Sequence, residues 1–418
     1  MYGMYRNDRL RICLISYRSN PHCGGQGVYI RNLSRGLTDL GHHVEVVSGP
    51  PDPLLDKDIQ LTMLPCLDLY NPEDMFRIPT FREFCDPVNI AEWLGVATMG
   101  FPEPFTFGFR ALRYFRKRFH MYDIIHDNQS LSYGIWGISK FMPTIATIHH
   151  PITVDRDIAV KSVRAPWKKL KHMRWYSFVG MQKRVSKRLP GIITVSERAM
   201  NDISRDFKVP KKKFRIVPNG INTDVFYPIP EIEREKGRII VTNSSDTPLK
   251  GLFYLLHAVA EISKNRKIKL VVVGYPKKKG GIIKLIRKLD IGRHITFTGR
   301  IDDKEFVKQY ARASMAVVPS VYEGFGLPVG EAMACGVPVI STTGGALPEV
   351  VGDAGVLVPP KDSELLADAI IKLLDNPDYA LKLGNAGFQR VMENFTWQRA
   401  AEKTVRAYRE VIRDYSRL

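Results

Sequence analysis

Short apolar runs alternate with helical patterns along the first half of the chain. Apolar residues recur at helical spacing from Ile30 to Leu40, and Gly41 follows as a stop signal. Strands separated by helices predict a parallel, doubly wound sheet. The runs rich in β-branched residues that have the length of strands are 11–16, 44–48, 123–128, 144–149 and 192–196.

The same alternation returns after 227–237, a segment whose prolines and charges suit a linker. Helical periodicity closes the chain at 397–418. We therefore predict an α/β protein with two Rossmann-like domains, at 1–224 and 225–396, that face each other across a cleft. The strand-length runs of the second domain are 238–243, 269–274, 295–299, 315–320 and 337–342.

One stretch departs from this pattern. Residues 65–109 are rich in proline and aromatic residues, and we interpret them as an irregular insertion in the first domain.

Composition indicates a globular protein of the cytoplasm. Of the 418 residues, 44% are hydrophobic, and no run of eighteen apolar residues is present to span a membrane. The first residues carry charges where a secretory signal needs its apolar core. The five cysteines are odd in number and form no C-x-x-C pair, so we expect reduced thiols and no zinc site.

The net charge of +19 is concentrated in the first half. Residues 1–222 hold 33 Lys and Arg against 20 Asp and Glu, a difference of 13. We therefore expect an anionic partner for this half.

The most informative segment surrounds Glu323 and Glu331, which stand eight residues apart. An apolar run of strand length is followed by a glycine-rich turn at 323–326. Pro328 suits the first turn of a helix that ends at Gly336. A strand, a glycine loop and a helix N-terminus present free N–H groups and a positive dipole end to an anion. The two carboxylates could hold sugars on either side of a bound diphosphate. The alternative is that both are solvated, one on a loop and one as a cap.

With this segment the sequence resembles the family 4 glycosyltransferases, or glycosyl transferases group 1. These are retaining enzymes of the two-domain GT-B fold that use nucleotide-sugar donors. The E-x7-E element matches Glu323 to Glu331, and the resemblance extends from 21–25 to the last helix. It implies that Glu323 contacts the transferred sugar and that Glu331 holds the donor ribose. It also implies that the last helix crosses back to the first domain. The donor pocket would be lined by Gly324 and by the amides of Phe325, Gly326 and Leu327.

Glycines follow the first predicted strand and open the first helix. Without Cβ atoms, Gly24 and Gly25 let a phosphate or sugar approach their amides, although a simple tight turn is the alternative. In the family the matching loop faces the donor diphosphate or the acceptor. We assign Gly25 to the donor and Gly24 to the acceptor side.

Histidines stand at the carboxyl ends of two predicted strands, where ligands of open α/β sheets bind. The family's T-x-H element aligns with His149, which we expect to donate to the transferred sugar or polarise its anomeric region. His150 is its neighbour. His126 resembles the D-x-x-H strand end of the family and points to the acceptor side, with Asn128 as a companion. A core or surface histidine is the alternative in each case.

Lys250 follows a strand and precedes a helical segment, so its ammonium is a candidate to hold the diphosphate. A solvated lysine is the alternative. The family pairs this Lys with an Arg five or six residues earlier, where this chain has Ser244 and Ser245. Because of that departure, one positively charged side chain fewer would contact the departing diphosphate. Arg300 occupies a position where the family lines the nucleotide base.

No metal or cofactor is expected. The pair Asp155-x-Asp157 imitates the metal-binding D-x-D of the other main glycosyltransferase fold, but the predicted two-domain parallel architecture excludes that fold.

The segment 161–188 carries ten Lys and Arg and no acidic residue, with aromatic residues between them. Such a segment could lie on an anionic membrane, each nearby cation contributing about 1 kcal/mol. A solvated basic helix, a site for a phosphate-bearing acceptor, and RNA binding are the alternatives. The last lacks a recognition fold.

These features predict a metal-independent hexosyltransferase. It would move a hexose from a nucleoside diphosphate sugar to an acceptor hydroxyl with retention of configuration. A nucleotide-sugar epimerase, a phosphorylase, or a non-enzymatic protein that binds lipid or nucleic acid are the alternatives. The base, the sugar and the acceptor stay open, and a lipid-linked acceptor at the inner face of the cell membrane is among the choices.

Overall fold

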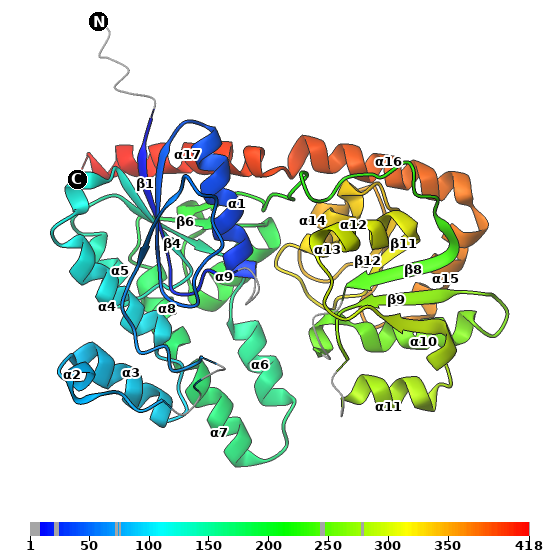
Figure 1. The fold of residues 1–418 in the computed structure, drawn as a ribbon, viewed down its shortest axis with the longest axis horizontal. Helices are drawn as coiled ribbons and strands as arrows, with labels where there is room; N and C mark the ends of the chain where they lie inside the picture. The colour runs from blue at the N-terminus through cyan, green and yellow to red at the C-terminus, as the bar shows by residue number, and fades with distance from the viewer. Residues whose placement is uncertain are drawn as a thin grey trace, which may run out of the picture. The chain divides into compact units, whose positions relative to one another are not determined.

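The computed structural model describes residues 9–20, 25–71, 74, 77–242, 247–276 and 280–417. The chain divides into two compact units (Figure 1). The first comprises Met1–Val195, Ala199–Val217 and Ala400–Leu418, and the second comprises Ser196–Arg198 and Pro218–Arg399. Among the described residues, no helix is long and apolar enough to cross a membrane.

The first unit is built on a seven-stranded parallel sheet in the order β3-β2-β1-β4-β5-β6-β7. Its strands are β1 (Arg11–Ser16), β2 (His43–Ser48), β3 (Gln60–Met63), β4 (Ile124–Asn128), β5 (Thr144–Ile148), β6 (Gly191–Thr194) and β7 (Phe214–Ile216). Its helices are α1 (Gly25–Asp39), α2 (Phe81–Phe84), α3 (Pro87–Ala97), α4 (Glu103–Phe115), η2 (Phe119–Met121), α5 (Tyr133–Ile138), α6 (Thr153–Lys161), α7 (Pro166–Trp175), η3 (Tyr176–Phe178), α8 (Val179–Ser186), α9 (Glu197–Phe207) and η4 (Lys211–Lys213).

All five runs predicted as strands in this half are strands. In β1, five of the six positions are buried, as expected for a parallel strand in the middle of a sheet. The two strands that were missed, β3 and β7, form the edges of the sheet. Each is short and only partly buried, so neither required a continuous apolar run.

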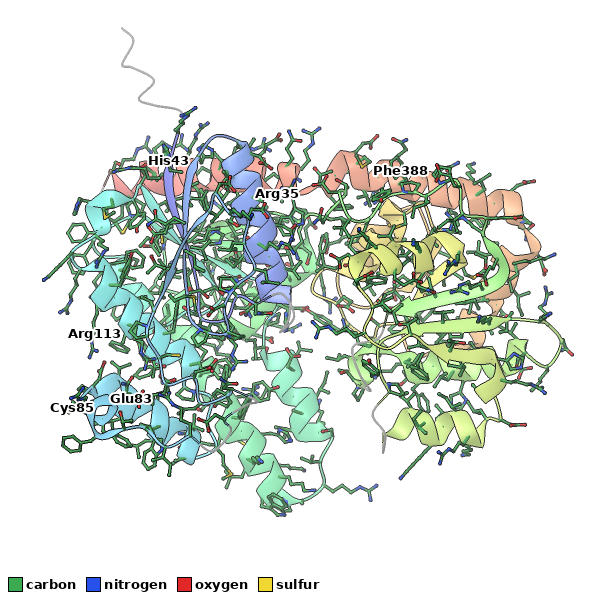
Figure 2. The ribbon with its side chains drawn as sticks, viewed as in Figure 1. Arg35, His43, Glu83, Cys85, Arg113 and Phe388 are labelled. Atoms are coloured by element: carbon green, nitrogen blue, oxygen red, sulfur yellow. The ribbon has the colours of Figure 1, made fainter. Side chains whose placement is uncertain are left out.

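The prediction that 65–109 is irregular was wrong, because α2, α3 and the start of α4 lie there. Thr80 and Glu83 form a capping box at α2, and the side chain of Asp86 caps α3. The prolines of α3 and α4 stand in their first turns, where a proline does not break a helix. Glu83 and Cys85 mark this end of the first unit in Figure 2.

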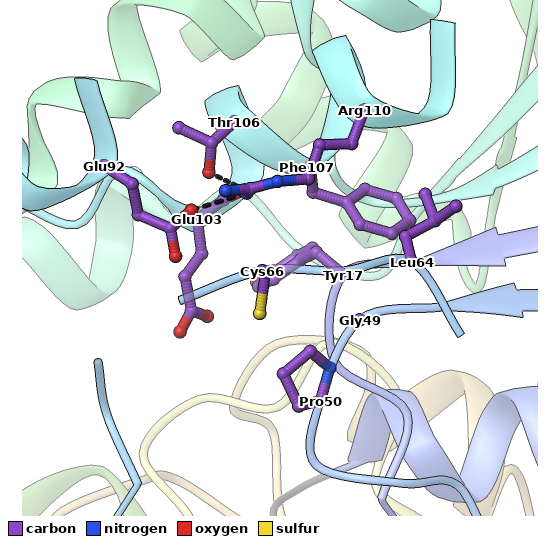
Figure 3. A pocket seen from close by; sticks show the side chains of 10 residues that line it. All are labelled: Tyr17, Gly49, Pro50, Leu64, Cys66, Glu92, Glu103, Thr106, Phe107 and Arg110. Atoms are coloured by element: carbon purple, nitrogen blue, oxygen red, sulfur yellow. Dashed lines mark hydrogen bonds and ion pairs between the residues drawn. The ribbon is translucent and has the colours of Figure 1, made fainter. Parts of the chain in front are cut away.

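A buried ion pair joins α3 to α4. Arg110 Nη1 lies 2.5 Å from Glu92 Oε2, and the two side chains are 6% and 2% exposed. They line the small pocket of Figure 3, whose free volume of about 20 Å³ suits a single water. Glu103, beside them, is held by Arg18 at 2.6 Å. This corner of the unit is therefore a structural ionic cluster with no room for a sugar.

Breaking the buried pair should destabilise the first unit strongly. Arg110→Ala leaves the Glu92 carboxylate buried without its cation, which should cost about 3–5 kcal/mol in the free energy of unfolding. The matched control is Arg113→Ala on the same helix; Arg113 is labelled in Figure 2. Its side chain is 50% exposed and pairs with Asp86 at 2.7 Å, so its loss should cost less than about 1 kcal/mol. Urea unfolding followed by circular dichroism measures both, and equal losses would contradict this assignment.

The second unit is built on a six-stranded parallel sheet in the order β10-β9-β8-β11-β12-β13. Its strands are β8 (Glu235–Thr242), β9 (Lys269–Val273), β10 (Ile295–Phe297), β11 (Ala313–Val318), β12 (Val339–Thr342) and β13 (Val356–Val358). Its helices are η5 (Pro248–Lys250), α10 (Leu252–Ile262), α11 (Gly281–Lys288), η6 (Gly292–His294), α12 (Asp303–Arg312), α13 (Leu327–Ala334), α14 (Leu347–Val351), α15 (Ser363–Asp375) and α16 (Pro377–Asn394).

All five runs predicted as strands here are strands, and the one missed, β13, is again a three-residue edge strand. Apolar residues of α10, α11 and α15 pack with those of β8 and β9 into one buried core. Two parallel, doubly wound sheets confirm the predicted fold class.

The last helix, α17 (Trp397–Tyr415), has one apolar face, as its periodicity predicted. From Ala400 onward it belongs to the first unit. Its Tyr408 is fully buried there, and Arg215 pairs with its Glu410 at 2.8 Å.

Candidate functional site

The centre of the candidate site in the second unit is an ion pair between two residues that the sequence predicted to bind the donor. Lys250 Nζ lies 2.7 Å from Glu323 Oε1, and the Ser320 hydroxyl donates to the same oxygen at 2.8 Å. The two charged side chains are 29% and 13% exposed. Lys250 is the last residue of η5, and Glu323 lies in the loop that follows β11. The sheet therefore brings together residues that are 73 positions apart in the chain.

The loop after Glu323 exposes backbone amides at the start of α13. Gly326 has a φ of +106°, a conformation that favours glycine, and a Cβ there would lie 2.7 Å from the side chain of Leu347. No side chain caps this helix. The amides of Phe325, Gly326 and Leu327 donate to no acceptor among the described residues. They are available for an oxyanion at the positive end of the helix.

Glu331 lies one turn into α13, in the same loop-and-helix segment as Glu323. Burial raises the pKa of its carboxyl to about 7, although the nearby Lys250 ammonium favours the ionised form. The carboxyl of Glu331 is thus partly protonated at neutral pH. In that form it both donates and accepts hydrogen bonds, which suits a pair of ribose hydroxyls.

Other predicted donor residues have different environments. The ring of Phe325 is buried and packs edge-to-face on Phe395 at 5.7 Å, so only its backbone is open to a ligand. The carbonyl of Gly324 accepts from the Ser196 hydroxyl at 2.8 Å. Arg300 is exposed after β10 and pairs with no described side chain. Ser244 and Ser245 lie outside the described residues.

In the first unit, His149 follows β5 and is fixed by Asn128, the last residue of β4. The Asn128 amide nitrogen donates to the Ser16 hydroxyl and to the carbonyl of Gln26, so its oxygen faces His149 Nε2 at 2.9 Å. Burial, together with the nearby His150, lowers the pKa of His149 to about 3. The ring is therefore neutral, with its proton on Nε2.

This tautomer changes the role that we expected for His149. Its Nε2–H is already donated to Asn128, so the ring has no proton to donate to a sugar. The remaining nitrogen, Nδ1, is an acceptor. The ring also packs edge-to-face against Tyr29 at 4.7 Å, which fixes its plane.

His126 is a core histidine. It is 1% exposed, its Nδ1 lies 2.6 Å from the Tyr408 hydroxyl, and its Nε2 lies 2.6 Å from the Thr147 hydroxyl. Burial lowers its pKa to about 3. Both ring nitrogens are occupied, which leaves neither for an acceptor.

The other residues of the first unit that the sequence predicted for the site are His150, Gly25 and Gly24. His150 Nε2 lies 2.7 Å from Asp155, the first residue of the D-x-D imitation. Gly25 is the first residue of α1, and a Cβ there would meet nothing within 4 Å. Gly24 lies outside the described residues.

Sequence reasoning missed Gln129, which orders the loop of His149 and His150, called here the histidine loop. Its side-chain oxygen accepts from the His149 backbone N–H at 2.9 Å, and its amide donates to the His150 carbonyl. It is 2% exposed and has a φ of +58°, unusual for a residue other than glycine. The only sequence signal was its position directly after a strand.

Comparisons with known proteins show the family to which the chain belongs. Residues 23–225 match the family described as Glycosyltransferase Family 4, and residues 228–390 match Glycosyl transferases group 1. The chain is 45% identical over 408 residues to the MMP alpha-(1->4)-mannosyltransferase of Mycolicibacterium hassiacum, covering 96% of this chain and 98% of that protein. The chain belongs to glycosyltransferase family 4.

Two further relatives extend the comparison. A D-inositol 3-phosphate glycosyltransferase of Corynebacterium diphtheriae is 26% identical over 428 residues, covering 96% of this chain and 94% of that protein. The structure of sucrose-phosphate synthase from Thermosynechococcus elongatus superposes with a TM-score of 0.74 and 26% identity, covering 97% of this chain and all of that one. The protein is therefore a GT-B glycosyltransferase, which decides against the epimerase and the non-enzymatic alternatives.

The basic segment of this glycosyltransferase is not one continuous helix. Residues 161–188 form the end of α6, then α7, η3 and α8. Trp167, Leu170 and Met173 of α7 are 65%, 69% and 58% exposed, whereas Phe178 and Met181 are buried. Some of the apolar residues of the segment thus face the core and others face solvent. Contact of α7 with an anionic membrane stays a prediction.

The raised pKa of Glu331 makes stability depend on pH. A carboxyl that binds its proton more tightly in the folded state stabilises the protein fully below its ordinary pKa of 4.5, and this contribution is lost as the pH rises to about 7. Glu331→Gln removes the dependence, so the difference in unfolding midpoint between the wild type and the variant should fall over this range.

Thermal unfolding measured at several pH values checks this expectation. His126 and His149, whose pKa values are lowered, act in the opposite direction, but they are common to both proteins. Parallel profiles for the two proteins would show that folding does not raise the pKa of the Glu331 carboxyl.

Proposed function

We propose that this glycosyltransferase moves a hexose, specifically mannose, from a nucleoside diphosphate sugar to a hydroxyl of a saccharide acceptor, with retention of configuration and without a metal. The choice of mannose follows the printed activity of the relative that is 45% identical over nearly the whole chain. Retention of configuration is what the resemblance to the family implies, and the residues around Glu323 support the nucleoside diphosphate donor and the absence of a metal.

One observation carries the proposal: three unpaired amides lie in the same loop-and-helix segment as two carboxyl groups, and the ammonium of Lys250 pairs with one of these carboxyls. Lys250 and the amides of Phe325, Gly326 and Leu327 offer the positive charge and N–H donors that a departing diphosphate needs. Glu323 and Glu331 offer acceptors for sugar and ribose hydroxyls. The Lys250–Glu323 pair keeps both side chains in place before a donor binds.

The chemistry needs little from the protein beyond positioning and charge. The bond between the anomeric carbon and the phosphate oxygen breaks as the acceptor oxygen bonds to the same face of that carbon. The phosphate oxygen that leaves takes the proton of the acceptor hydroxyl. Donors that stabilise the developing negative charge on the diphosphate lower the barrier, so no protein nucleophile and no metal is required.

Metal independence rests on the residues available. Asp155, the first residue of the D-x-D pair, is already bonded to His150 Nε2 at 2.7 Å. The charge that a divalent cation supplies in other enzymes is assigned to Lys250 and the helix N-terminus.

The proposed part of His149 is to accept a hydrogen bond at Nδ1 from a hydroxyl of the substrate. Its neutral state and its fixed ring suit this role. Positioning through an acceptor of this kind orients a sugar without adding charge near the reacting carbon.

Glu323→Gln should lower kcat by at least about 100-fold with the fold intact. The amide keeps the shape of the side chain but removes the charge paired with Lys250 and one acceptor. The assay is release of the nucleoside diphosphate from GDP-, UDP- and ADP-sugars with a mannose oligosaccharide as acceptor. Glu393→Gln, an exposed residue of α16, is the control and should keep wild-type activity.

Two results would overturn the proposal. Wild-type rates for Glu323→Gln would remove this residue from the site. Failure of the unaltered protein to bind or consume any of the three classes of donor would reject the nucleotide-sugar donor itself.

A further inference from the structure

A groove in the first unit lies apart from the histidine loop and holds two positively charged side chains. It has a volume of about 450 Å³ and lies between α3, the start of α4, and the segment from α7 to α8. The helices α3 and α7 lie at the same end of the first unit in Figure 1. The side chains that define its character are Phe101, Phe105, Tyr133, Arg174, Phe178 and Arg184.

Arg174 is held in place by neutral partners. Its Nη1 donates to the Ser177 hydroxyl at 2.9 Å, and its Nη2 donates to the Thr98 hydroxyl at 2.6 Å. A Cβ on Gly100 would lie 2.8 Å from Nη1, so this glycine makes room for the guanidinium. The side chain is thus fixed in the wall of the groove while its charge stays without a counterion.

Arg184 of α8 is more exposed than Arg174 and makes one hydrogen bond. Its Nη1 donates to the Tyr133 hydroxyl at 3.2 Å. Among the described residues, no carboxylate pairs with Arg174 or Arg184. The carboxylates on neighbouring elements have other partners, since Glu92 pairs with Arg110 and Glu103 with Arg18.

Two guanidinium groups without a carboxylate partner in one groove, Arg174 held by two hydroxyls and Arg184 bonded to one, are an arrangement suited to an oxyanion. Guanidinium groups bind phosphate and carboxylate through parallel hydrogen bonds. The aromatic rings of Phe101 and Phe105 give the groove apolar walls, against which a sugar ring can pack.

The groove is linked to the candidate catalytic histidine through one loop. Tyr133 lines the groove, and Gln129, four residues earlier, binds the His149 backbone. Gln182 of α8 is buried and stands in the sequence between Met181 and Arg184, which both line the groove. Its side-chain amide donates to the carbonyl of Gln129 at 3.0 Å. A ligand in the groove thus lies against the elements that hold His149.

We propose that this groove binds the anionic group, a phosphate or a carboxylate, of the saccharide acceptor. The identification of the ligand as the acceptor rests on the proposed function. The binding of an anionic sugar in the groove does not depend on that function. The sequence had indicated a phosphate-bearing acceptor only as one alternative for the basic segment. Arg174 and Arg184 are the residues that would bind its phosphate.

Titration calorimetry with simple probes tests the groove directly. Glucose 6-phosphate and glucuronate should bind at least about tenfold more tightly than glucose, and the difference should shrink as salt is raised. Arg184→Met should remove most of this preference. Arg184 is exposed, so its loss should leave the fold intact. The control is Arg188→Met, a nearby arginine whose guanidinium lies over the Trp136 ring instead.

The outcomes distinguish a saccharide from a lipid headgroup as the source of the anion. They also distinguish failure of the groove proposal from failure of the proposed function. Preference for vesicles of phosphatidylglycerol over glucose 6-phosphate, lost in Arg184→Met, would place a lipid headgroup in the groove and overturn the saccharide acceptor. Equal binding of glucose and glucose 6-phosphate, or no effect of Arg184→Met, would overturn the groove as an anion site even if transfer to neutral acceptors proceeds. Binding that survives in the inactive Glu323→Gln variant supports the groove independently of the reaction.

Discussion

The ion pair between Lys250 and Glu323 is the constraint on which the donor site depends. A half-buried carboxylate would be costly without a cation, and a lone ammonium would be free to turn to solvent. Together they fix each other in a loop whose next residues expose unpaired amides. The same pair therefore provides both the local stability of the loop and the charge that the reaction requires.

Burial sets the protonation states of the other candidate groups. It raises the pKa of Glu331 and lowers those of His126 and His149, so all three are biased towards their neutral forms. A neutral Glu331 carboxyl and the free Nδ1 of a neutral His149 are able to bind hydroxyls, whereas both ring nitrogens of His126 are already occupied. Charge on the donor side is thereby confined to the Lys250–Glu323 ion pair and one helix terminus.

The fold was predictable because its central strands are buried on both faces. Such strands must be apolar throughout, and every predicted run of this kind is a strand. Edge strands β3, β7 and β13 escaped prediction because partial exposure relaxes that demand. The helices α2 and α3 carried visible capping signals, but their prolines and aromatic residues obscured them.

The candidate site was only partly predictable for a different reason. The E-x7-E spacing placed Glu323 and Glu331 on one loop and helix, which is local information. The partner of Glu323 and the tautomer of His149 depend on contacts between residues distant in sequence. The roles of Gln129, Arg174 and Arg184 likewise come from loops and helices that only the fold brings together.

Binding of free GDP and UDP to the wild type and to Lys250→Met, measured by titration calorimetry, tests the central claim most directly. If Lys250 and the amides of α13 form the diphosphate site, the variant should bind the nucleoside diphosphate at least about tenfold more weakly. The loss should be smaller for the monophosphate GMP or UMP. Equal affinity of wild type and variant for GDP and UDP would contradict the account.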